Sequence, residues 1–187
     1  MTQTAARLIA VDGINARALK DAARTLTSSN RRQEAGVSLW GASGIFDELT
    51  IADQDAGTPS ARTLLLLYAA DLAFRLRWEI QPALEEGRCV IAAPYVSTAV
   101  ALGQAAGLDT KWLTDLFSFA PRAAEHHVVD PGPARPVADR KGFVEFAWQR
   151  LEKRLGGVTR LQLMDRTRRH LRATARRAPS ETPRLRR

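Results

Sequence analysis

Short apolar runs that alternate with helical stretches place the strongest constraint on how this chain can fold. Residues 6–11 (ARLIAV) and 88–93 (RCVIAA) are largely apolar over their whole length. Such runs are typical of strands buried on both faces of a parallel sheet. Residues 36–40 and 126–129 are predicted as two further strands, and residues 160–164 as a fifth. The pattern predicts an α/β three-layer sandwich with a five-stranded parallel sheet.

The stretches between these runs have the spacing of helices. Residues 61–84 carry the longest such pattern, with apolar residues three or four positions apart. The region 41–60 is rich in Gly, Asp and Ser and is expected to be a loop with a short helical turn. The remaining predicted helices are 16–26, 98–106, 110–120, 142–155 and 166–177. Because ligands of open parallel sheets bind at the carboxyl ends of the strands, the loops at those ends are the expected site.

The 187 residues fit one globular domain, and the positive charge is concentrated at its end. Residues 1–159 hold 18 Lys and Arg against 18 Asp and Glu, whereas residues 160–187 hold 10 Arg against Asp165 and Glu181. This excess accounts for the whole net charge of +8. We expect a folded domain over residues 1–165 and an Arg-rich appendage over residues 166–187, the last part of it disordered.

The composition also indicates the cellular compartment in which the protein is expected. The longest apolar stretches are shorter than the roughly 18 residues of a membrane span, and no signal peptide is evident. Cys89 is the single cysteine, which rules out a disulfide within the chain. A cytoplasmic protein with a buried thiol is therefore expected.

Three stretches carry a resemblance to the thymidylate kinase family. Residues 64–101 (LLLLYAADLAFRLRWEIQPALEEGRCVIAAPYVSTAVA) are similar to the family's LLxFAADR helix, its I.PAL..G..VI segment and its strand ending in DRYV.SS.A. Residues 107–120 (GLDTKWLTDLFSFA) resemble GLD..WI..L..FA, and residues 8–15 (LIAVDGIN) resemble FIVFEGID, the strand that enters the phosphate loop. The resemblance is collinear over residues 7–165. It implies the P-loop fold of nucleoside monophosphate kinases, and a homodimer with the apolar face of residues 61–84 as its interface.

The sequence departs from the family in the phosphate loop. Where the family has EGIDGSGKST, residues 12–21 are DGINARALKD, so that Leu19 occupies the position of the catalytic lysine. Two glycines that let backbone N–H groups wrap the phosphates are alanines here. A one-residue shift would instead align Lys20 with the lysine and Arg17 with a loop arginine of some members. Lys20 and Arg17 are therefore the candidate catalytic residues if the chain is active.

Other phosphate and base contacts of the family are also missing. The Asp-Arg-Tyr after the third strand is Ala93-Pro94-Tyr95, and the arginine that contacts the base is Leu72. The residues that remain candidates for nucleotide binding are Asp12, Gly13, Asn15, Tyr68, Asp71, Tyr95 and Arg140. In the alternative, the two tyrosines pack in the core and Asp71 caps or pairs locally.

Arginines recur along the last predicted helix. They are Arg166, Arg168, Arg169, Arg172, Arg176 and Arg177. Their density is typical of a nucleic-acid binder, and it would equally suit docking to an acidic protein or a solvated chain end. No aromatic residue lies between them, so contact with nucleic acid is expected through the phosphate backbone.

The missing cations predict a thymidylate kinase-like protein that is catalytically inactive and acts by binding, as a regulatory or scaffold subunit. One alternative is a divergent kinase that uses ATP and Mg²⁺ to phosphorylate a nucleoside monophosphate such as dTMP. The other is a nucleic-acid-associated protein that uses the Arg-rich C-terminus. No cofactor is expected unless the kinase alternative holds, and no metal site, because adjacent His126 and His127 point to opposite faces of a strand. No membrane association is expected.

Overall fold

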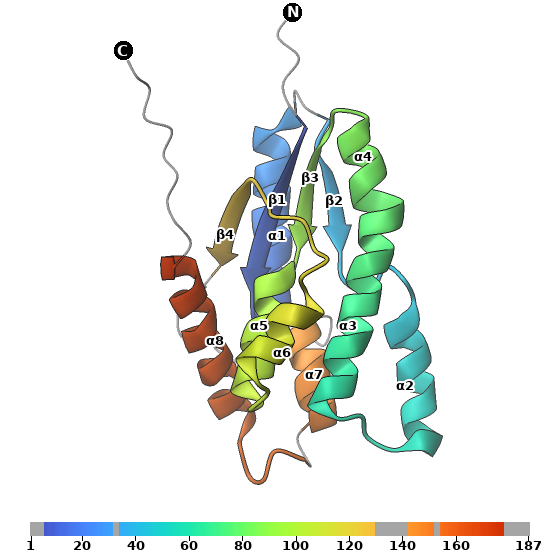
Figure 1. The fold of residues 1–187 in the computed structure, drawn as a ribbon, viewed down its shortest axis with the longest axis vertical. Coiled ribbons are helices and arrows are strands. Elements are labelled where there is room, and N and C mark those ends of the chain that lie inside the picture. Colours follow the sequence, from blue (N-terminus) through green and yellow to red (C-terminus); the bar gives the residue numbers. More distant parts are fainter. Residues whose placement is uncertain (1–5, 32–33, 130–141, 152–153, 178–187) are drawn as a thin grey trace, which may run out of the picture.

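The computed structural model describes residues 6–31, 34–129, 142–151 and 154–177. Its centre is a sheet of four parallel strands in the order β2-β3-β1-β4 (Figure 1). The strands are β1 (Arg7–Gly13), β2 (Gly36–Leu39), β3 (Cys89–Ala93) and β4 (Glu125–Val129). Each of them overlaps a run that the sequence predicts as a strand, so the parallel α/β architecture is confirmed.

The predicted five-stranded sheet is wrong, because residues 160–164 form the start of helix α8 (Arg160–Arg177). Thr159 and Gln162 form a reciprocal cap at the start of this helix. The backbone N–H of Thr159 donates to Oε1 of Gln162 at 2.8 Å, and the backbone N–H of Gln162 donates to Oγ1 of Thr159 at 3.3 Å. The buried residues of α8 that recur every four positions are Leu163, Thr167 and Leu171. They face α5 (Val96–Ala105). The alternation in RLQLM suggests a strand, but the four-residue repeat that continues past it is helical.

Region 41–60, predicted as mostly loop, contains the helix α2 (Ile45–Ala56). Glycines with positive φ lie at both ends, Gly44 at 76° and Gly57 at 75°. Phe46 is buried, and two acidic residues of the first turn, Asp47 and Glu48, suit the positive end of the helix dipole. The polar composition of the region therefore predicts a loop, whereas the glycines at both ends and the buried Phe46 are the features that indicate a helix.

Helices cover both faces of the sheet, which confirms the three-layer prediction. On one face α1 (Ala16–Ser29) packs Leu19 and Ala23 against Ile9, Val11 and Ile91. The other face carries the longest helical segment, made of α3 (Ala61–Arg75), the π-helical turn η2 (Leu76–Ile80) and α4 (Gln81–Glu85). The helices α5, α6 (Thr110–Leu116) and α7 (Phe143–Leu151) complete the core on that side. In Figure 1, α1 lies behind the sheet and α3, α5 and α6 lie in front.

Gly13 lets two strand ends come together. A β-carbon at Gly13 would lie 2.8 Å from the carbonyl oxygen of Val129, closer than a side chain tolerates. The carboxyl ends of the strands point to the lower end of the molecule in Figure 1, where α2 and α7 lie. None of the helices in the described ranges is long and apolar enough to cross a bilayer.

Candidate functional site

The connection from β1 to α1 is shorter than a phosphate-binding loop. β1 ends at Gly13 and α1 begins at Ala16, so Ile14 and Asn15 alone connect them. The Oδ1 atom of Asn15 accepts the N–H of Ala18 at 2.9 Å and caps the helix. The pattern GxxxxGK[ST] places four residues between its two glycines before the helix. Counted from Gly13, that loop would extend to Ala18, which here already belongs to the first turn of α1.

The residues of α1 that align with the family's catalytic lysine and loop arginine point in different directions. Leu19 is buried and packs in the cluster of Ile9 and Val11. Lys20 lines a cavity at the carboxyl edge of the sheet. Arg17 points to solvent, with its side chain 78% exposed and its Nε 3.9 Å from the carboxylate of Asp21. The structure therefore brings Lys20, and not Arg17, to the candidate site.

Asp12 is fully buried at the end of β1, and its carboxylate caps another helix. Its Oδ1 accepts the N–H groups of Tyr95 (3.0 Å) and Thr98 (2.9 Å) and the hydroxyl of Thr98 (2.8 Å). Its Oδ2 accepts the N–H of Ser97 at 3.3 Å and lies 2.9 Å from Nε2 of His126. The three backbone donors are those at the start of α5, where a negative charge is stabilising. Asp12 is thereby engaged in holding β1, α5 and β4 together.

Asp71 and Arg75 form an ion pair with both side chains fully buried, Nε of Arg75 lying 3.1 Å from Oδ2 of Asp71. Asp71 also accepts the N–H groups of Gly41 and Ser43, each at 3.1 Å, and the Ser43 hydroxyl at 2.8 Å. The guanidinium donates to the carbonyl oxygen of Pro94 at 3.2 and 3.3 Å. Asp71 thus fixes the turn after β2, and Arg75 fixes the turn after β3.

The two tyrosines bond to backbone carbonyls. The Tyr68 hydroxyl donates to the carbonyl oxygens of Tyr95 (2.6 Å) and Pro94 (3.0 Å), and its ring lies 4.3 Å from that of Phe143 between centroids. The Tyr95 hydroxyl donates to the carbonyl oxygen of Pro121 at 2.7 Å. Burial raises the pKa of both phenols well above their ordinary value, so both remain donors.

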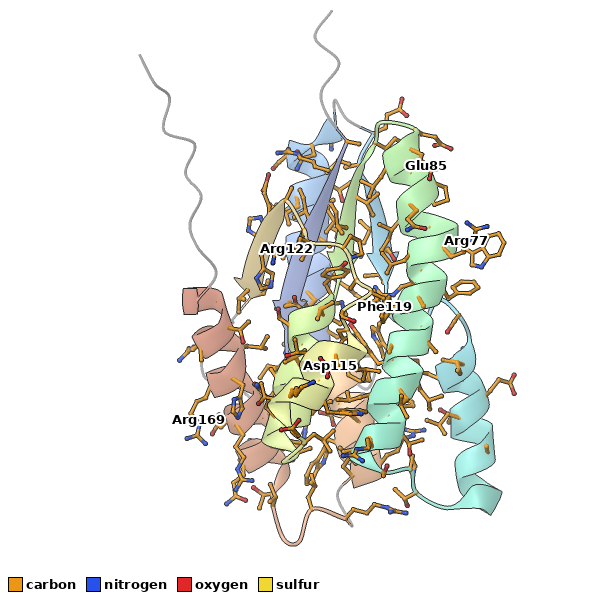
Figure 2. All side chains as sticks on the ribbon, in the orientation of Figure 1. Arg77, Glu85, Asp115, Phe119, Arg122 and Arg169 are labelled. Carbon is orange, nitrogen blue, oxygen red and sulfur yellow. The ribbon has the colours of Figure 1, made fainter. Side chains whose placement is uncertain are left out.

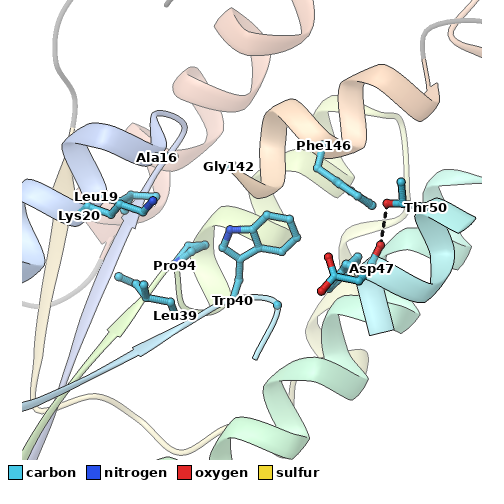
Figure 3. Close-up of a pocket in the computed structure, with 13 residues that line it drawn as sticks. Ala16, Leu19, Lys20, Leu39, Trp40, Asp47, Thr50, Pro94, Gly142 and Phe146 are labelled. Atoms are coloured by element: carbon cyan, nitrogen blue, oxygen red, sulfur yellow. Dashed lines mark hydrogen bonds between the residues drawn. The ribbon is translucent and has the colours of Figure 1, made fainter. Parts of the chain in front are cut away.

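A cavity of about 390 Å³ lies at the carboxyl edge, between α1, α2, α7 and the ends of β2 and β3 (Figure 3). Its apolar walls include Leu39, Trp40, Phe46, Ala93, Pro94 and Phe146. Its polar lining among the described residues consists of Lys20, Asp47 and Thr50 side chains. The edge where the family's phosphate contacts are expected is therefore mostly apolar and aromatic here.

Several sequence-predicted residues lie elsewhere. Arg140 lies outside the described residues, as do the side chains of Arg176 and Arg177. Arg166, Arg169 and Arg172 are exposed on α8, and Arg168 pairs with Asp165 at 2.8 Å. In Figure 2, Arg169 projects from α8 away from the sheet. Within the ranges described, no three His, Cys, Asp or Glu side chains gather as a metal ion would need.

Sequence reasoning missed Arg75, Thr98 and the aromatic wall of the cavity. The spacing of Asp71 and Arg75, four residues apart in an apolar helix, was a usable signal for a buried pair. The wall joins Trp40, Phe46 and Phe146, which are up to 106 positions apart in the sequence. No local pattern connects residues at that distance.

The parallel sheet with helices on both faces defines an α/β three-layer protein, whose ligands are expected at the carboxyl edge of the sheet. A thymidylate kinase from Ehrlichia chaffeensis has the same fold, with a TM-score of 0.63 over 92% of this chain and 87% of that one, at 13% identity. No protein-family model matches the chain.

The chain also has local sequence similarity to thymidylate kinases. A probable thymidylate kinase from Pyrococcus horikoshii is 47% identical over 57 residues, 30% of this chain and 28% of that protein. One from Pyrobaculum calidifontis is 34% identical over 97 residues (52% and 48%), and a thymidylate kinase from Symbiobacterium thermophilum 39% over 87 residues (44% and 41%). The chain thus matches less than half the length of these curated relatives. Over part of its length, and in its fold, the chain is therefore similar to thymidylate kinases.

Arg75→Met should unfold the protein more easily, because it leaves the Asp71 carboxylate buried without its counter-ion. We expect a loss of about 3–5 kcal/mol in the free energy of unfolding, measured by urea denaturation. Arg77→Met, an exposed change on the same helical segment, is the matched control and should stay within about 0.5 kcal/mol. The pair Asp71→Asn/Arg75→Met should recover part of the loss. Equal stabilities of the Arg75 and Arg77 variants would contradict this role of the ion pair.

Proposed function

We propose that this chain keeps the thymidylate kinase fold without phosphoryl transfer and acts by binding, as a regulatory or scaffold subunit. The observation that carries the proposal is the β1–α1 turn, in which Asn15 caps a helix that already begins at Ala16. A loop that wraps phosphate needs free backbone N–H groups along several residues. Here the N–H groups of Ala18 and Leu19 bond to the side chain and the carbonyl of Asn15.

The charge at this edge supports the same proposal. Catalysis of phosphoryl transfer consists mostly of positioning and of cations that neutralise developing negative charge. Leu19 is buried, and Ala93 and Pro94 line the cavity with no charge at all. Asp12 and Asp71, which could otherwise serve a bound nucleotide or magnesium, are engaged by backbone and side-chain donors.

The divergent-kinase alternative depends on Lys20, since it is the one cation among the described residues that line the cavity. ATP and Mg²⁺ would be its cofactors. The single cysteine, buried in β3, is compatible with the reducing cytoplasm that we propose as the location.

In a coupled assay with ATP, Mg²⁺ and dTMP, we expect turnover at least a thousandfold below the roughly 1–100 s⁻¹ of active kinases. Lys20→Ala should leave any residual rate unchanged, as should the control Arg24→Ala on the exposed side of α1. Ordinary turnover that Lys20→Ala abolishes and Arg24→Ala does not would refute the proposal and establish the kinase alternative.

The family resemblance also leads us to propose a homodimer through the long helical segment. Its apolar stripe, with Leu65, Tyr68, Leu72 and Leu76, is buried in the core of the same chain and is not available as the predicted interface. The outward side instead exposes large apolar residues: Leu66 is 51%, Phe74 38% and Trp78 65% exposed. Exposed residues of this kind on one segment support pairing with a second copy.

Trp78→Glu should convert a dimer into a monomer, because it places a charge in the apolar contact. The measurement is sedimentation equilibrium at micromolar concentration. Leu161→Glu is the control, since Leu161 is 62% exposed on α8, a different helix. A monomeric wild-type protein, or a dimer unaffected by Trp78→Glu, would exclude this interface.

The outer side of α8 favours a second function, contact with nucleic-acid phosphates. Arg166, Arg169 and Arg172 are three residues apart and exposed, while the opposite side of the helix packs on α5. Arg166 and Arg169 have no partner among the residues that the structure describes. Exposed arginines along one side of a helix are typical of a surface that contacts nucleic-acid phosphates.

Arg166→Ser/Arg169→Ser should weaken binding to a random-sequence DNA duplex. The salt slope of log K should fall by about 1.8, because each phosphate that is no longer neutralised accounts for about 0.9. Arg24→Ser/Arg77→Ser removes the same charge from other surfaces and should leave the slope nearly unchanged. Fluorescence anisotropy at salt concentrations from about 50 to 200 mM provides the measurement. Equal slopes for the two double variants would eliminate α8 as the contact surface.

A further inference from the structure

We propose that the cavity beside the β1–α1 turn binds a small aromatic monoanion, and not a nucleotide polyphosphate. Its volume of about 390 Å³ lies within the range of small-molecule sites, roughly 300–1,000 Å³. Most of its walls are apolar, and one amine enters from α1. The walls have this character whether or not the chain transfers phosphate.

A rigid aromatic cluster forms the largest wall. The Trp40 ring meets the Phe46 and Phe146 rings edge to face, with centroids 5.0 and 5.6 Å apart. Trp40 also packs against Phe143 at 5.7 Å, which fixes the indole between α2 and α7 (Figure 3). Rings held in this way offer an aromatic ligand both apolar area and favourable ring contacts, without an ordering cost.

Lys20 gives the cavity its preference for a single negative charge. Its ammonium makes no ion pair or hydrogen bond with a described residue, so it is available to an anionic group. Asp47 lines the same cavity from the first turn of α2. One cation facing one carboxylate can neutralise a monoanion at the Lys20 side, whereas a polyphosphate would lack counter-charges and be repelled by Asp47.

Thr50 adds little to this preference because its hydroxyl is already engaged. It donates to the carbonyl oxygen of Phe46 at 2.8 Å and accepts from the Arg150 guanidinium at 3.0 Å. Selection therefore rests on ring contacts with the aromatic wall and on the charge of Lys20.

The full chain can be titrated with 8-anilinonaphthalene-1-sulfonate, an aromatic monoanion whose fluorescence rises in apolar surroundings. We expect saturable binding of one dye per chain. Lys20→Met should weaken it about tenfold, the usual worth of one charge-assisted hydrogen bond. The neutral analogue N-phenyl-1-naphthylamine should bind both proteins equally. Circular dichroism verifies that each variant is folded.

Leu39→Glu gives a second, independent change. Leu39 is 37% exposed at the end of β2, so a carboxylate is tolerated there, and it adds a negative charge to the cavity. It should weaken the sulfonate dye more than the neutral one. Leu161→Gln, on the exposed side of α8, is the control for dye bound to other apolar surface and should have no effect.

Three outcomes would overturn the proposal. The first is a wild-type protein that binds no dye, and the second is binding that Leu161→Gln abolishes while Lys20→Met and Leu39→Glu do not. The third is displacement of the dye by pyrophosphate with an affinity that Lys20→Met also lowers, which would make the cavity an oxyanion site. The coupled kinase assay tests phosphoryl transfer without any dye. Failure of the dye-binding proposal can therefore be distinguished from failure of the proposed function.

Discussion

The buried carboxylate of Asp12 holds together the part of the molecule on which the site depends. It accepts the N–H groups of Tyr95, Ser97 and Thr98 and contacts His126, so the end of β1, the start of α5 and β4 meet at one charged group. A buried carboxylate is costly unless donors surround it, and here the donors are backbone groups at a helix start. The energetic requirement of this single charge therefore fixes how three elements meet at the carboxyl edge of the sheet.

A second buried charge completes the arrangement from the other side. Asp71 and Arg75 tie α3 to the turns after β2 and β3, and the Arg75 guanidinium and the Tyr68 hydroxyl both donate to the carbonyl of Pro94. The next residue, Tyr95, gives its N–H to Asp12. In the segment after β3, the carbonyls of Pro94 and Tyr95 thus accept hydrogen bonds from α3, and the N–H of Tyr95 donates to Asp12 of β1. These buried polar groups at the carboxyl edge are all used to bond the protein to itself.

The strands could be predicted from the sequence where burial on both faces requires a run of consecutive apolar residues. β1 and β3 are apolar on consecutive positions because helices cover both of their faces, and these two strands were the clearest signals. Residues 160–164 were misassigned because five residues of alternating character satisfy a strand pattern, whereas the capping pair Thr159 and Gln162 decides for a helix. In the site, Lys20 was found through a shifted alignment, but the aromatic wall was not. Trp40 and Phe146 become neighbours only through the fold.

The capped start of α1 has a consequence for any attempt to rebuild a phosphate loop in this protein. Changing Leu19 to lysine would supply an amine and leave the chain path as it is. The first turn of α1 would still have to unwind, breaking the bonds that Asn15 makes with the N–H groups of Ala18 and Leu19. What separates this backbone from a phosphate-wrapping one is therefore its route through space between Gly13 and Ala18, which an insertion can alter and a point substitution cannot.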